Sequence, residues 1–185
     1  THLAQYLQRE REAFEAVRLW VELEPENLGA NGTLATLLAR QGRTREALPH
    51  LVTVARGGEA AKFPLLLNRF KALPDSEKAA LDSEVAQLID TEFPDNTSLL
   101  LTHALMAEES GRPALALERL EPIFDQEPYQ AQAVIMEAKI VTAQEAKNPL
   151  TRMQAALKND PAQSQLRLQY ARLLARSDMA AAREQ

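Results

Sequence analysis

Apolar positions in this chain recur every three or four residues, which is the period of an amphipathic helix. The stretch from Leu81 through Val85 to Ile89 is one example, with its apolar residues spaced four apart. Proline, glycine and asparagine interrupt the pattern where helices are expected to begin or end. The pattern therefore predicts an all-α chain without β-strands. The predicted helices span residues 3–8, 10–23, 27–41, 44–56, 60–72, 76–92, 96–110, 113–126, 129–145, 148–159 and 162–176.

Four prolines mark a repeat. Pro94 and Pro128 are 34 residues apart, Pro128 and Pro161 are 33 apart, and Pro25 lies 69 residues before Pro94, which is two units and one extra residue. A period of this length is typical of stacked helical hairpins. We interpret the chain as one solenoid segment, an excerpt of a longer array. Its approximate units are 1–25, 26–59, 60–94, 95–128, 129–161 and 162–185.

Small residues recur inside the units. Alanine, glycine and alanine lie 10, 17 and 22 residues after both Pro25 and Pro94. The glycine suits a tight turn between two helices, and the alanines let the helices of a hairpin approach closely. These residues are Ala35, Gly42, Ala47, Ala104, Gly111 and Ala116. We expect Ala104, Ala116 and Ala138 at close helix contacts.

The segments that carry these small residues, 40–48 and 109–117, resemble the tetratricopeptide repeat family. The unit spanning residues 57–93 departs from the family pattern because it lacks its proline and its turn glycine. The resemblance implies a right-handed α-α superhelix of antiparallel helix hairpins. It also implies that the first helix of each hairpin lines a concave surface on which partner proteins bind.

Residues 7 and 11 positions beyond each proline are expected on that concave surface. In the first full unit they are Gly32 and Thr36. In the later units they form the predicted partner-binding set, which is Leu101, Leu105, Ile135, Lys139, Leu168 and Arg172. The apolar members favour a groove for apolar side chains of a partner. The alternative is that these leucines simply pack against one another.

The composition argues against several classes of function. The chain has no cysteine, and His2, His50 and His103 lie in no metal-ligand spacing, so we predict neither a metal site nor a cofactor. No catalytic residue can be named, and we expect no enzyme. The net charge of −5, without a basic stripe, argues against nucleic acid. No apolar run approaches the roughly 20 residues that span a bilayer.

The expected function is therefore a protein-interaction scaffold that binds a protein or peptide, with self-association possible. The Leu-, Ala- and Arg-rich repeats and their proline links are similar to bacterial outer-membrane tetratricopeptide lipoproteins, which are adaptors for periplasmic C-terminal processing proteases. That resemblance implies a protease partner and a periplasmic, membrane-tethered full-length protein, with the cytoplasm as the alternative location. The alternative function is a structural subunit of a secretion, pilus or polysaccharide-export machine.

Overall fold

The computed structural model describes residues 2–144 and 150–183, and the side chains of 9–144 and 150–175. These residues contain helices and turns and no β-strand, so the predicted all-α fold is confirmed. The helices pack mainly on their neighbours along the chain, as in a solenoid of hairpins. The chain divides into two compact units, residues 1–87 and 88–185, and each is described by itself.

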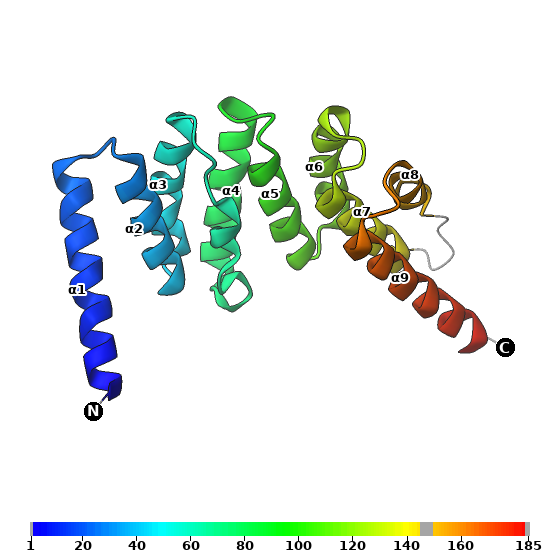
Figure 1. Ribbon diagram of the computed structural model, residues 1–185, viewed down its shortest axis with the longest axis horizontal. Coiled ribbons are helices and arrows are strands. Elements are labelled where there is room, and N and C mark those ends of the chain that lie inside the picture. The colour runs from blue at the N-terminus through cyan, green and yellow to red at the C-terminus, as the bar shows by residue number, and fades with distance from the viewer. Residues whose placement is uncertain (1, 145–149, 184–185) are drawn as a thin grey trace. The chain divides into compact units, whose positions relative to one another are not determined.

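The first unit is built around one helical hairpin. Helices α2 and α3 pack along each other, α1 lies against α2, and a short 3₁₀ segment follows the hairpin (Figure 1). This unit ends within α4, whose Leu81 and Val85 are fully buried. The elements are α1 (His2–Leu23), α2 (Leu28–Arg40), α3 (Thr44–Arg56), η1 (Phe63–Leu67), η2 (Phe70–Ala72) and α4 (Asp75–Thr91).

The second unit repeats the hairpin and extends it. Helices α5 and α6 form the hairpin, and α7 contacts α6, α8 and α9. Asn96 caps α5 by accepting a 2.9 Å hydrogen bond from the Leu99 amide, just as Asn27 caps α2. The elements are α5 (Thr97–Glu109), α6 (Pro113–Gln126), α7 (Ala131–Gln144), α8 (Thr151–Asn159) and α9 (Ser164–Arg183).

Both hairpins close as the repeated glycines predict. Gly42 and Gly111 have φ angles of 79° and 71°, a left-handed conformation that glycine adopts without steric cost. After Gly42, the Arg43 amide donates a 2.9 Å hydrogen bond back to the Leu38 carbonyl, which satisfies a free carbonyl at the end of α2. The turn therefore reverses the chain and caps the helix at once.

The expected small residues lie in the core. Ala104 and Ala116 have no exposed surface and Ala138 is 2% exposed. Ala47, which is equivalent to Ala116, is also fully buried. Side chains this small at buried positions allow neighbouring helices to approach closely.

Two parts of the predicted helix map were wrong. The break between 3–8 and 10–23 is absent, since α1 is continuous over both ranges. The predicted helix at 60–72 is instead two 3₁₀ turns, separated by Arg69 in a left-handed conformation at φ 58°. Pro122 lies inside α6 without ending it. The predicted start of the 148–159 helix falls outside the described residues, and α8 begins at Thr151.

Candidate functional site

A groove of about 430 Å³ runs beside α2 in the first unit. Its floor is a row of small residues on α2, and its walls come from α3 and from the segment that follows α3. The lining residues are Leu28, Gly29, Gly32, Thr33, Thr36, Leu37, Arg40, Leu51, Val54, Glu59, Ala60 and Lys62. The groove therefore lies on the first helix of a hairpin, which is where we expected a binding surface.

The threonines of the floor use their hydroxyl groups inside α2. Thr33 Oγ1 donates to the Gly29 carbonyl at 2.7 Å, and Thr36 Oγ1 donates to the Gly32 carbonyl at 2.9 Å. These hydroxyl protons are consequently engaged in the helix. The side chains of the floor are small, and the floor offers mainly carbon atoms to a ligand.

The groove is open because of one position in the repeat. Gly32 lies 7 residues after Pro25, the same offset that Leu101 and Ile135 have from their own prolines. Leu101 and Ile135 are each only 8% exposed, so in α5 and α7 a large side chain at this position packs into the protein. In α2 the position carries no side chain, and the space beside it is left empty.

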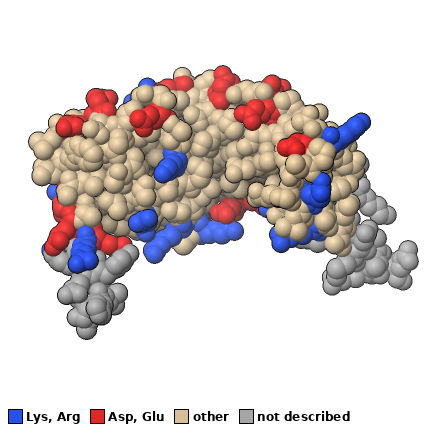
Figure 2. Space-filling view, viewed as in Figure 1, with Lys and Arg blue, Asp and Glu red and all other residues tan. Residues whose placement is uncertain are grey.

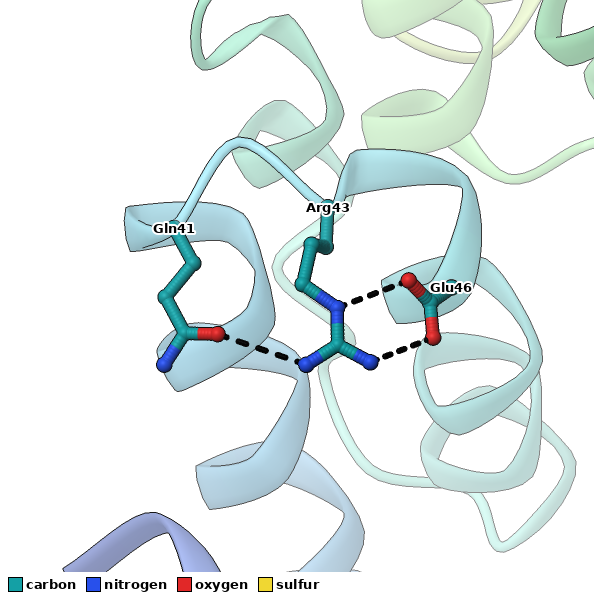
Figure 3. Close-up of polar contacts among 3 residues, drawn as sticks. All are labelled: Gln41, Arg43 and Glu46. Carbon is teal, nitrogen blue, oxygen red and sulfur yellow. Dashed lines mark hydrogen bonds and ion pairs between the residues drawn. The ribbon is translucent and has the colours of Figure 1, made fainter. Parts of the chain in front are cut away.

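A polar cluster stabilises the turn near one end of α2. The Arg43 guanidinium binds Glu46 through two hydrogen bonds of 2.7 Å and reaches Gln41 Oε1 at 3.4 Å (Figure 3). The hydrogen bond from Arg43 lowers the pKa of Glu46, and the same contact raises the pKa of Arg43. Arg43 also lies 5.3 Å from the centre of the Phe14 ring. The cluster thus links α1 to the hairpin and has no acid or base in an unusual protonation state at neutral pH.

A second polar cluster lies between α2 and α3. Asn31, which is 2% exposed, donates through Nδ2 to the carbonyls of Pro25 and Asn27 at 2.7 and 2.9 Å. Its Oδ1 lies 2.8 Å from His50 Nδ1, so that nitrogen is the donor. Burial lowers the pKa of His50, opposed by the nearby carboxylate of Glu46. The cluster holds the chain before α2 against α3, which is a structural role.

A larger hollow of about 530 Å³ lies between α7 and α8 in the second unit. Its charged residues are already paired with each other. Arg152 Nε lies 3.1 Å from a carboxylate oxygen of Glu137, and its guanidinium lies 3.7 Å from the centre of the Phe124 ring. Because this cation is engaged twice within the chain, the hollow has less charge to offer a ligand than the groove on α2.

Charged side chains of both signs lie on the surface. Figure 2 shows one face, on which acidic and basic side chains both occur among a larger area of uncharged residues. Among the described residues no group of histidines and carboxylates is arranged to hold a metal ion. None of the helices within residues 2–144 and 150–183 combines the length and apolar character needed to cross a membrane.

Comparison with known proteins gives one informative relative. No family model matches the chain. A curated protein of Pseudomonas aeruginosa, described as TPR repeat-containing, is 30% identical over 170 residues. The match covers 91% of this chain and 28% of that protein, so the chain spans just over a quarter of its relative's length. The similarity supports the tetratricopeptide repeat family.

The structure places the six expected binding residues in different surroundings. Leu101 and Ile135 are buried and Leu105 is half-buried, as expected if the leucines pack within the chain. Leu168 is 51% exposed, and Lys139 and Arg172 are also exposed. The groove on α2 involves none of these six. Gly32 and Thr36 have the same offsets from their proline, but the sequence prediction favoured the apolar residues of the later units. It therefore did not identify the groove beside Gly32.

Proposed function

We propose that this chain is a protein-binding scaffold that holds partner segments against the first helices of its hairpins. The groove on α2 is the observation that carries the proposal. It is an open hollow beside Gly32, whereas the equivalent residues of α5 and α7, Leu101 and Ile135, are large and buried. The tetratricopeptide similarity supports protein binding in general, since such repeats expose extended surfaces to partners.

The first helices of the second unit contribute to the proposed surface through their exposed residues. Leu168 and Arg172 lie one helical turn apart on α9, and Lys139 lies on α7. An exposed leucine with a cation one helical turn away suits a partner segment with both apolar and acidic side chains. Leu101 and Ile135 are buried and Leu105 is half-buried, so of these three Leu105 has the most side-chain surface to offer a partner.

We further propose that the scaffold acts as an adaptor for a protease, tethered to a bacterial outer membrane through a part of the protein outside this chain. This finer proposal rests on the similarity of the repeats to adaptor lipoproteins. Co-purification of the full-length protein with a protease from its own cells, and recovery of both in the outer-membrane fraction, are the expected results. A stable complex with a secretion or pilus machine and no protease would favour the structural-subunit alternative.

Substitution of exposed first-helix residues tests the scaffold proposal without disturbing the fold. We expect Leu168→Ser with Lys139→Glu to weaken capture of the natural partner about tenfold or more, because apolar contact is lost and a charge is reversed. Lys158→Glu on the second helix α8, which is also exposed, is the matched control and should leave capture within about twofold of the unsubstituted chain. Equal loss in both variants, or in neither, would count against binding by first helices.

A further inference from the structure

We infer that the groove on α2 receives a leucine or isoleucine side chain of the partner, with an acidic residue of the same segment beside it. This inference names the partner chemistry of one part of the proposed binding surface and therefore rests on the proposed function. It is carried by three observations: the glycines of the floor, the equivalent positions in the other hairpins, and two cations in the lining.

The glycines of the floor are not required by the fold. Neither Gly29 nor Gly32 has a positive φ. A Cβ atom at Gly32 would lie 3.8 Å from Val54 Cγ2, and one at Gly29 would lie 3.5 Å from Asn27 Oδ1, which are ordinary contacts. Gly57 differs, since a Cβ there would lie 2.5 Å from Leu28 side-chain atoms.

Glycine inside a helix is disfavoured relative to alanine, because it costs more conformational entropy. Gly57 lies at the C-cap of α3, outside the helix, and packing against Leu28 explains it, whereas Gly29 and Gly32 lie inside α2 and no packing contact explains them. What the two glycines do achieve is to leave two positions of the floor, between and beside the threonines, without a side chain. Such a floor permits close approach of a partner to the helix backbone.

Two of the equivalent positions indicate the kind of side chain that would fit. Three other residues have the same repeat offset as Gly32: Leu101 and Ile135 are packed into the protein with 8% of their surface exposed, and Leu168 is 51% exposed. The walls beside Gly32 are aliphatic, and they include buried Leu51 and Val54. A partner's leucine or isoleucine in this groove would therefore occupy a repeat position that the chain fills with its own side chain elsewhere.

The charges of the lining define the neighbouring residue. Arg40 and Lys62 line the groove together with a single acid, Glu59, which leaves one net positive charge. Within the part of the chain that the structure describes, neither cation makes an ion pair. A carboxylate of the partner placed beside the aliphatic side chain would be attracted by this net positive charge, whereas a lysine or arginine there would be repelled.

The test uses a fluorescein-labelled nine-residue peptide with a central Leu, a Glu two residues to either side, and Gly and Ser elsewhere. Binding is measured by fluorescence anisotropy. We expect Gly32→Leu to weaken binding about tenfold or more, because the chain's own side chain then fills the groove. Ala79→Leu adds the same side chain at an exposed position of α4 outside the groove, and should change binding less than about twofold. Peptides with Ser in place of Leu, or Lys in place of Glu, should also bind more weakly.

Stability measurements separate occlusion of the groove from unfolding. Gly32→Leu and Gly32→Ala should melt at or above the temperature of the unsubstituted chain, since both relieve a helical glycine. If Gly32→Leu unfolds the protein, Gly32→Ala provides the binding test, and we expect it to weaken binding at least about threefold by narrowing the floor. Unchanged peptide binding in the folded variant, or no binding to the unsubstituted chain, overturns the inference.

The same variants distinguish this inference from the scaffold proposal. Capture of the natural partner that is weakened by the Leu168 and Lys139 substitutions but unaffected by Gly32→Leu would refute the groove assignment and leave the scaffold standing. Capture that depends on none of these positions would refute both.

Discussion

Replacement of Ala116 by leucine tests whether the repeated alanines set the spacing of the hairpin helices. Ala116 has no exposed surface on α6, and the next residues on the same face, Leu120 and Ile123, are also fully buried. A leucine at this position has no free volume to enter, so α5 and α6 must separate or neighbouring side chains must leave their preferred rotamers. Overpacking of this kind costs about 1–3 kcal/mol.

Urea unfolding followed by circular dichroism measures this cost. For a slope of about 2 kcal/mol per molar urea, the expected loss lowers the midpoint by roughly 0.5–1.5 M. Ala114→Leu is the matched control, because Ala114 is exposed on the same helix and the two residues differ little in helix propensity. If Ala116→Leu and Ala114→Leu unfold at the same urea concentration as the unsubstituted chain, the proposed close contact is absent.

Three further predictions concern polar groups. Asn96→Ala removes the cap of α5 and should lower the free energy of unfolding by about 1 kcal/mol in urea titrations, while Asn96→Asp should retain most of it. Asn31→Ala leaves buried partners unsatisfied and should cost about 1–3 kcal/mol in the same assay, and a smaller effect than at Asn96 would contradict this. Because the pKa of His50 in the folded chain is below its ordinary 6.5, its contribution to stability is complete above that pH and declines as pH falls through 6.5 towards the lowered value. Melting temperatures across this range should fall more steeply for the unsubstituted chain than for His50→Gln, and parallel curves would exclude this role.

The sequence predicted those parts of the fold that depend on local chemistry. The four prolines and the turn glycines fix where helices end, and Gly42 and Gly111 adopt the left-handed conformation that a tight turn needs. The helical spacing of apolar residues was not enough to predict the structure of residues 60–72. These residues form two 3₁₀ turns on either side of Arg69 instead of an α-helix. Tertiary packing decides such short segments, because an isolated helix of that length is marginal.

The candidate site was harder to predict because exposure depends on packing between units of the repeat. Leu101 and Leu168 occupy the same repeat offset, yet one is 8% exposed and the other 51%. The open position at Gly32 gave a usable signal, namely a small residue where the other units carry a large one.

Site-specific photo-crosslinking in living cells tests the central claim, that partners bind the first helices, most directly. A photoreactive amino acid is placed in turn at exposed first-helix positions, Leu168 and Arg172, and at exposed second-helix positions, Arg45 and Lys158. The scaffold account predicts that the same partner protein is crosslinked from the first-helix positions and not from the second-helix positions. Crosslinking of that partner from Arg45 and Lys158 alone would contradict the account.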